Sequence, residues 1–239
     1  MRNNINYKTF WTSINDVLRP DSSNDWKKKY FAETIQYLDS SKDIIEVGCG
    51  SADFIISNKH LFNNIIGIEF SDLMVKHAQK LIDEKKIDNI TIYKADATEI
   101  NKHIKEKVDV VYSRGLIQYL SNNQFRLFLK NSIPLIKETG YIMHMDIPNK
   151  IMRTFYLLNM HKTEHTFSAF KFFIKFIRMR LFMFRKAGFK HFDDSIGYWY
   201  SFKEIKEIAK ENELKVEFFY SKLPPFSYRF HARFTKSNS

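Results

Sequence analysis

A short apolar strand that runs directly into a glycine turn constrains this chain more than any other feature. Residues 43–52 read Asp-Ile-Ile-Glu-Val-Gly-Cys-Gly-Ser-Ala, which is an apolar run, two glycines and the start of a helix. Gly48 and Gly50 permit backbone conformations and a close approach that a Cβ would block. The pattern predicts a site where a ligand lies against the backbone, at the carboxyl ends of the strands of an α/β sheet. Taken alone, the turn could also join a strand to a helix without binding anything.

Strand and helix patterns alternate along the chain after this turn. We expect the other strands at residues 65–69, 90–94, 108–112, 141–147, 215–220 and 228–235. Helices are expected at residues 51–60, 71–86, 121–137 and 201–212. The link between the last two strands is too short for a crossover helix, so these two strands must be antiparallel. We therefore predict an α/β, Rossmann-like, seven-stranded, mostly parallel sheet with an antiparallel last strand, helices on both faces and a helical lid insertion.

The chain divides into four segments. An N-terminal helical cap is expected over residues 1–40 and a cofactor-binding core over 41–149. A basic, aromatic helical insertion that would form a lid follows at 150–197, and a C-terminal helix with two strands completes the sheet at 198–239. The single cysteine excludes a disulfide framework and a structural zinc site, and we expect no metal. Without a signal-peptide or membrane-spanning pattern, we expect a cytoplasmic protein.

Polar residues follow consecutive strands of the predicted sheet and should therefore converge on one edge. Glu69 ends the second strand, where an acid can accept both hydroxyls of a ribose. Asp96 follows the third strand, where an acid can accept the exocyclic amine of an adenine. Ser113-Arg114-Gly115 follows the fourth strand. The candidate cofactor-binding residues are Glu46, Gly48, Cys49, Gly50, Glu69, Phe70, Asp96, Ala97, Ser113, Arg114 and Gly115.

These motifs resemble those of the class I S-adenosylmethionine (SAM)-dependent methyltransferases. Glu46–Gly50 looks like the first motif of that family, and residues 67–69, 95–97 and 108–115 look like its next three. The resemblance covers residues 40–148 and 198–236. It implies that SAM is the cofactor and S-adenosylhomocysteine the product. It also implies that Glu46, Gly48 and Gly50 surround the methionine part, Glu69 holds the ribose and Asp96 and Ala97 hold the adenine. Gly115 or its neighbours would approach the sulfonium.

One position departs from the pattern of that family. Many members have a third glycine where this chain has Ala52, and alanine would be tolerated if the backbone is helical there. The next residue bears on the rival interpretation, a dinucleotide-binding fold, because Asp53 would repel a pyrophosphate at the start of the helix. SAM has no phosphate and carries a positive sulfonium, so acids near it are acceptable.

The residues after the strands also bear on the methyl acceptor. Members of the family that methylate exocyclic amines of DNA bases resemble one another in an Asn/Asp-Pro-Pro-aromatic motif, where this chain has Ser-Arg-Gly-Leu at 113–116. Methylation of cytosine C5 needs a catalytic cysteine, and Cys49 lies in the cofactor turn. The candidate bases are His144 and Asp146. They are two positions apart on the fifth strand, so their side chains should share one face of the sheet. His144 could equally be a core histidine, and Asp146 could be a turn acid.

The insertion carries most of the net charge. From Lys150 to His191 there are ten Lys or Arg and one acid, Glu164, which gives +9 of the +11 carried by the whole chain. A helix over residues 168–187 would have a basic face opposite a phenylalanine-rich face. This face could be solvated, could present cations to an anionic substrate as a lid, or could bind an anionic membrane surface at the inner membrane face. The candidate substrate-binding residues are Tyr119, Lys171, Lys175, Arg178, Tyr198 and Tyr200.

The function expected from these features is transfer of a methyl group from SAM to an oxygen or nitrogen of an anionic small molecule or of a sugar or glycan precursor. The segments 196–205 and 228–231 look like methyltransferases associated with bacterial surface-polysaccharide synthesis. Two alternatives belong to other classes. One is an RNA or other nucleic-acid methyltransferase, whose basic segment would grip phosphates, and nucleic acid is the less favoured partner because base-target motifs are absent. The other is a non-catalytic, membrane-associated subunit with a SAM-type fold.

Overall fold

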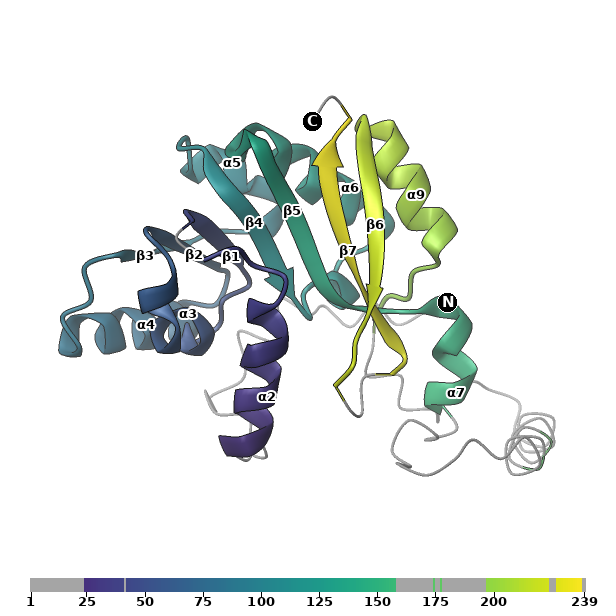
Figure 1. Cartoon of the computed structure of the whole chain (residues 1–239), viewed down its shortest axis with the longest axis horizontal. Helices are drawn as coiled ribbons and strands as arrows, with labels where there is room; N and C mark the ends of the chain where they lie inside the picture. Colours follow the sequence, from purple (N-terminus) through teal and green to yellow (C-terminus); the bar gives the residue numbers. More distant parts are fainter. Residues whose placement is uncertain are drawn as a thin grey trace.

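A seven-stranded sheet forms the centre of the protein (Figure 1). The computed structural model describes residues 24–40, 42–157, 174, 177, 197–223 and 227–237. The strands follow the order β3-β2-β1-β4-β5-β7-β6. Strands β1 to β5 pair in parallel, whereas β7 is antiparallel to both of its neighbours, β5 and β6. This confirms the predicted Rossmann-like sheet. The strands are β1 (Ile44–Val47), β2 (Ile65–Glu69), β3 (Ile90–Lys94), β4 (Val108–Arg114), β5 (Ile136–Pro148), β6 (Leu214–Tyr220) and β7 (Arg229–Lys236).

Helices cover both faces of the sheet, and each face has its own apolar core. On one face, α5, α6 and α9 bury side chains such as Ile100, Phe125 and Ile208. On the other face, α2, α3 and α4 pack with residues such as Ile55 and Ala78. The α-helices are α2 (Asn24–Ile35), α3 (Asp53–Ser57), α4 (Asp72–Glu84), α5 (Ile100–His103), α6 (Asn122–Ser132), α7 (Arg153–Leu157) and α9 (Phe202–Glu211). Short 3₁₀ helices are η1 (Lys59–Leu61), η2 (Ala97–Glu99), η3 (Ile117–Tyr119), η4 (Ile133–Leu135) and η5 (Lys150–Met152).

Two of these helices begin with complete capping boxes. The Ser121 hydroxyl accepts from the Gln124 backbone N–H, and the Gln124 side chain accepts from the Ser121 backbone N–H at the start of α6. Ser201 and Glu204 make the same reciprocal pair at the start of α9. Each pair satisfies two of the backbone donors that the first turn of a helix leaves without partners. Both helices therefore start at the residue that their sequence indicates.

Strand lengths differ from the prediction at the centre of the sheet. β4 continues for two residues beyond 112, so Ser113 and Arg114 lie within the strand and pair with His144 and Met145 of β5. The register between β5 and β7 then shifts after His144. At this bulge Asp146 has a left-handed backbone conformation, with φ of 59°. A bulge of this kind redirects the side chains that follow it, which breaks the expected alternation along β5.

The structure describes only part of the expected cap and lid. Within residues 1–40 it describes α2, which packs on the face of the sheet that also carries α3 and α4. Within the insertion it describes η5 and α7, and the cationic stripe at Lys171, Lys175 and Arg178 lies outside the described residues. No helix in the described part of the chain has the length and apolar character that crossing a bilayer requires.

Ala52 does not have the backbone conformation that the sequence suggested. It precedes α3 with φ of 61° and ψ of 20°, which is left-handed rather than right-handed helical. An L-residue with a Cβ pays about 1–2 kcal/mol in this region. The side chain is also fully buried, so its methyl group contributes packing. The expectation that alanine fits because the backbone is helical was therefore wrong, and Ala52 occupies a position that favours glycine.

We expect Ala52→Gly to be at least about 1 kcal/mol less destabilising than Ala209→Gly, because only Ala52 is relieved of left-handed strain. The two alanines are comparably buried, at 0% and 1% exposure, so the loss of a methyl group largely cancels in the comparison. Ala209 lies inside α9, where glycine costs about 1 kcal/mol in helix propensity. Urea unfolding of both variants measures the difference, and an equal loss of stability would contradict strain at Ala52.

Candidate functional site

The glycine turn and Glu69 form one hydrogen-bonded unit at the carboxyl ends of β1 and β2. The Gly50 backbone N–H donates to Glu69 Oε2 at 2.9 Å, and the Ser71 backbone N–H donates to Glu69 Oε1 at 2.7 Å. A Cβ built on Gly50 would meet no heavy atom within 4 Å. The backbone at Gly50 therefore borders open space, and a ligand there can approach both this backbone and the Glu69 carboxylate. This arrangement fits SAM, whose ribose the sequence motifs assign to Glu69.

A buried acid lies beneath the turn. Glu46 on β1 is 8% exposed, and its Oε2 has no hydrogen-bond partner among the described residues. Burial raises the pKa of Glu46 to about 8, the nearby Tyr112 hydroxyl lowers it in part, and the charges of Glu69 and Asp53 raise it further. Near neutral pH this carboxyl is largely protonated in the absence of a cationic neighbour. A positive ligand group, such as the ammonium or sulfonium of SAM, would favour its ionised form.

The third acid lies at the end of β3. Asp96 caps η2 and accepts from both the backbone N–H and the hydroxyl of Thr98, at 2.9 and 2.7 Å. Ala97 follows in η2, and Phe70 follows β2 with a half-buried side chain. The backbone N–H of Ala95 donates to the Glu69 carbonyl, which keeps the ends of the two strands together. The residues that the motifs assign to the ribose and the adenine therefore lie on adjacent strand ends.

The end of β4 differs from the expected cofactor contact. Ser113 is fully buried, and its hydroxyl is hydrogen-bonded to His144 Nδ1 at 2.9 Å. Cys49 is also buried, and burial raises its pKa well above the usual range. Gly115 has a left-handed conformation, and its carbonyl accepts from Gln118 Nε2 at 2.8 Å. Among these residues, Gly115 is the one that can bring backbone to a ligand at this strand end.

Arg114 joins α2 to the carboxyl ends of β4 and β5. Its guanidinium donates to Asp146 Oδ2 at 2.7 Å and to Glu33 Oε2 at 2.5 Å. It also donates to the Tyr30 carbonyl and the Thr34 hydroxyl, and it lies 3.5 Å from the centroid of the Tyr30 ring. The side chain is 4% exposed. Arg114 was expected to contact the cofactor, and in the structure its side chain is bound to three residues of α2.

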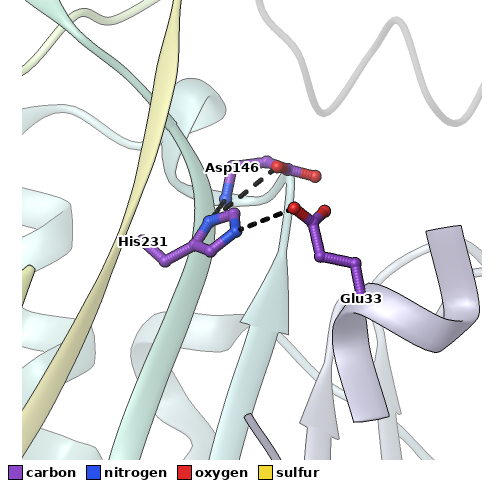
Figure 2. A group of neighbouring side chains, drawn as sticks. All are labelled: Glu33, Asp146 and His231. Carbon is purple, nitrogen blue, oxygen red and sulfur yellow. Dashed lines mark hydrogen bonds and ion pairs between the residues drawn. The ribbon is translucent and has the colours of Figure 1, made fainter. Parts of the chain in front are cut away.

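Glu33, Asp146 and His231 form a buried group around this guanidinium (Figure 2). The Asp146 backbone N–H donates to His231 Nδ1 at 3.0 Å, and His231 Nε2 points toward Glu33 Oε1 at 3.8 Å. Glu33 Oε1 also accepts from the Lys222 backbone N–H at 2.8 Å. Burial alone would raise the pKa of Glu33, but His231, the Lys222 amide and Arg114 lower it to about 2. The carboxylate therefore remains ionised in the folded protein at all but strongly acidic pH.

The hydrogen bonds of this group argue against a metal ion. Because His231 Nδ1 accepts a hydrogen bond, the proton of the neutral imidazole lies on Nε2. A nitrogen that carries a proton offers no lone pair to a metal. Asp146 and Glu33 are both already bonded to Arg114. These three residues fit an ion-pair network better than a metal centre.

The two candidate bases lie on opposite sides of the sheet and do not share a face. The His144 ring is fully buried against Phe125, Phe128 and Phe234, and burial lowers its pKa to about 3. Asp146 instead faces Arg114 and His231, on the side covered by α2. The positive φ at Asp146 and the bulge in β5 account for the difference. Neither the Asp146 carboxylate nor the His144 imidazole is accessible to an acceptor in this conformation.

The described substrate candidates lie near the end of β4. Tyr119 closes η3, and the Tyr198 backbone N–H donates to the Gln118 carbonyl at 2.9 Å. The Tyr200 hydroxyl donates to the Leu120 carbonyl, so this side chain has a structural contact of its own. No sequence pattern singled out Glu33, whose partners lie 81 to 198 residues away along the chain. No periodicity pairs His231 with Asp146, which lies 85 positions before it in the chain.

We expect Glu33→Ala to lower the free energy of unfolding by about 3–5 kcal/mol, because it leaves the buried Arg114 without one of its carboxylates. Glu217→Ala is the matched control. It also removes a carboxylate from an arginine, Arg233, but that pair is exposed, so we expect a loss below about 1 kcal/mol. Urea unfolding at pH 7 compares the two. Similar losses for both variants would show that the buried network does not hold α2.

We expect Glu46→Gln to gain stability relative to the wild type as the pH rises from 5 to 8. An unfolded Glu ionises near 4.5, whereas folded Glu46 ionises near 8, so the wild type loses stability through this interval. The loss is at most about 4 kcal/mol, and glutamine cannot ionise. Unfolding of both proteins at pH 5, 6, 7 and 8 without SAM measures it, with the exposed Glu84→Gln as control. A difference between Glu46→Gln and the wild type that does not change with pH would contradict the raised pKa.

Known proteins resemble this chain in sequence and in fold. A family model described as a methyltransferase domain matches residues 38–192. A 79-residue stretch is 33% identical to the 23S rRNA (uracil(1939)-C(5))-methyltransferase RlmD of Francisella tularensis, covering 32% of this chain and 18% of that protein. A 144-residue stretch is 24% identical to phosphoethanolamine N-methyltransferase 1 of Triticum aestivum, covering 56% of this chain and 29% of that protein. The chain therefore matches less than a third of the length of these two curated relatives.

Solved structures share the whole fold at low sequence identity. Magnesium protoporphyrin IX methyltransferase from Synechocystis PCC 6803, solved with bound S-adenosylhomocysteine, has a TM-score of 0.63 at 12% identity and covers 99% of this chain and 100% of its own. A phosphoethanolamine N-methyltransferase from Haemonchus contortus has a TM-score of 0.62 at 16% identity and covers 98% of this chain and 49% of its own. Because the family model spans more than half of the chain, this protein belongs to the class I SAM-dependent methyltransferases.

Proposed function

We propose that this methyltransferase acts on an oxygen or nitrogen of a small anionic molecule, such as a sugar or glycan precursor. The observation that carries the proposal is the +9 charge of residues 150–191, which directly follow the carboxyl end of β5 in the sequence. The cofactor side of the site is acidic, with Glu46, Glu69 and Asp96. A basic wall beside the sulfonium of SAM is unfavourable unless an anion lies between them.

Methyl transfer depends more on aligning the acceptor atom with the methyl group of SAM than on activating the acceptor. SAM supplies an electrophilic methyl group. An acceptor atom attacks the methyl carbon in line with the carbon–sulfur bond, which breaks and releases S-adenosylhomocysteine. The protein must hold that atom on the axis of the bond, and alignment of this kind can supply about 7–11 kcal/mol of the barrier. Glu69 fixes the glycine turn through Gly50 and Ser71, and Gln118 fixes the Gly115 carbonyl at the opposite side of the site.

We infer that His144 and Asp146 position the site and do not take a proton from the acceptor. His144 is enclosed by phenylalanines, and Asp146 is 1% exposed and bonded to Arg114. A base contributes about 10²–10⁴-fold only when it reaches the proton that it removes. A neutral amine or an already ionised acceptor would need no base. Turnover of Asp146→Asn that is unchanged at saturating SAM and acceptor would agree with this inference, and a loss of a thousandfold without a change in SAM affinity would contradict it.

RNA methylation is the second candidate, because one curated relative, 33% identical over 79 residues, is named as a methyltransferase of uracil C5 in 23S rRNA. Methylation of a pyrimidine C5 proceeds through covalent addition of a nucleophile, for which a thiolate is suited. The only cysteine of this chain is Cys49. It is buried in the cofactor turn with a raised pKa, which keeps the thiol protonated. These features favour a small-molecule acceptor over a pyrimidine ring.

The test is methyl transfer from radiolabelled SAM to two sets of acceptors. We expect label in phosphorylated and carboxylated amines or sugars and none in unmodified rRNA or tRNA. Changing Lys171, Lys175 and Arg178 together to Glu should raise the acceptor KM at least about tenfold, because each reversed charge weakens the attraction to an anion, and should leave SAM affinity unchanged. Label in RNA alone would overturn the proposal. A triple variant with normal KM that no longer sediments with anionic vesicles would identify the segment as a membrane-binding element instead.

A further inference from the structure

Arg229, at the start of β7, connects two segments at the carboxyl edge of the sheet. Its Nη1 donates to the Asp146 carbonyl at 3.0 Å, and its Nη2 donates to Gln118 Oε1 at 3.1 Å. Arg229 and Gln118 are both buried, and the guanidinium lies 5.0 Å from the centroid of the Tyr228 ring. One buried side chain therefore joins the bulge of β5 to η3, the short helix that follows β4.

The bulge end of this connection is held firmly. The Asp146 backbone N–H donates to His231 Nδ1, its carboxylate accepts from Arg114, and its carbonyl accepts from Arg229. These contacts compensate for the left-handed backbone of Asp146, whose φ is 59°. Because Arg229 is anchored on the β5 side by a carbonyl that is itself fixed, its other donor can fix the position of Gln118.

Arg229 also determines which way the amide of Gln118 faces. A guanidinium carries N–H donors and no acceptor, so the amide must turn its oxygen toward Arg229. The amide nitrogen then faces the Gly115 carbonyl, which can only accept, and donates to it at 2.8 Å. The reverse orientation would set two donors against each other at one end and two oxygens at the other. Arg229 therefore ensures that Gly115 meets a donor.

At Gly115 this series of hydrogen bonds reaches the glycine turn of the cofactor site. Gly115 has φ of 69°, and its backbone N–H donates to the Met145 carbonyl at 3.0 Å. A Cβ built on Gly115 would lie 3.7 Å from Gln118 Nε2. The next residue, Leu116, packs on the turn, since a Cβ built on Gly48 would lie 3.3 Å from Leu116 Cδ1. The orientation of the Gly115 carbonyl therefore affects how Leu116 lies against the turn.

We propose that Arg229 is a positioning residue of this methyltransferase. Through the Gln118 amide it holds residues 115–116 against the glycine turn in the arrangement that binds the cofactor. This role concerns the cofactor side of the site and is independent of the acceptor, so it goes beyond the proposed function. Removing Arg229 frees the Gln118 amide to turn, and the Gly115 carbonyl then loses its donor. The folded protein should therefore bind the cofactor more weakly.

The test is a double-mutant cycle on the calorimetric binding of S-adenosylhomocysteine to the full-length protein. Arg229→Met and Gln118→Met should each weaken binding by about tenfold, which corresponds to about one hydrogen bond. The double variant should also lose about tenfold, whereas independent effects would multiply to about a hundredfold. Arg229→Lys keeps a donor for Gln118 and should bind within about threefold of the wild type. Arg233→Met is the matched control on the same strand, where the guanidinium pairs with the exposed Glu217, and should leave binding unchanged.

Urea unfolding of the same variants separates positioning from stability. If Arg229 only stabilised the fold, Arg229→Met would lower the urea midpoint and leave the affinity of the folded protein unchanged, which would overturn the proposal. A hundredfold loss in the double variant would also overturn it, because Arg229 would then not act through Gln118.

If Arg229→Met does not fold, Gln118→Glu decides. Its carboxylate still accepts from Arg229 but gives the Gly115 carbonyl no donor. Binding of S-adenosylhomocysteine that is about tenfold weaker supports the positioning role, and unchanged binding overturns it. S-adenosylhomocysteine is the probe because its sulfur is neutral and is not attracted by the added carboxylate. None of these measurements uses an acceptor, so label found only in RNA or in uncharged acceptors would overturn the proposed function and leave the role of Arg229 standing.

Discussion

The buried guanidinium of Arg114 is the interaction on which the arrangement of the site depends. It lies at the end of β4, between a carboxylate from α2 and a carboxylate from the bulge of β5. Its charge would be costly to bury without both partners. Glu33 of α2 also accepts a hydrogen bond from the backbone N–H of Lys222, which follows β6. One network therefore connects α2, β4, β5 and the segment after β6. α2 thereby becomes part of the wall of the site, and is more than a polar cap.

Charge is divided across the site in a way that suits its two ligands. The cofactor side collects acids on β1, β2 and β3, and one of them, Glu46, is buried enough to be protonated near neutral pH without a cation beside it. The cations lie mainly in the insertion that follows β5, where residues 150–191 carry a charge of +9. Under the proposed function, a positive sulfonium and a negative acceptor would each find the opposite charge. The separation also explains why a phosphate-bearing dinucleotide is a poor fit for the glycine turn, which Asp53 follows.

Two of the four described non-glycine residues with positive φ lie at this edge of the sheet. Ala52 and Asp146 both have positive φ angles, and each lies where a strand or turn redirects the chain beside the site. Strain of this kind persists only where the surrounding contacts compensate for it. Around Asp146 the compensation is visible, since its backbone N–H bonds to His231 and its carboxylate to Arg114. Around Ala52 the compensating contact is the burial of its methyl group in the apolar core on the face covered by α2, α3 and α4.

The sequence by itself determined the sheet, its antiparallel last strand and the cofactor motifs, because apolar periodicity, glycines and capping residues act over a few neighbouring positions. Glu69 and Asp96 could be placed at strand ends for the same reason. Only the tertiary structure decided the rest. The separation of His144 from Asp146 depends on a bulge that period-two alternation does not reveal, and the left-handed Ala52 depends on the turn geometry. The network of Glu33, Arg114, Asp146 and His231 joins residues up to 198 positions apart, and pairings at that distance are fixed by the packing of α2 and β7 on the sheet, which no local pattern encodes.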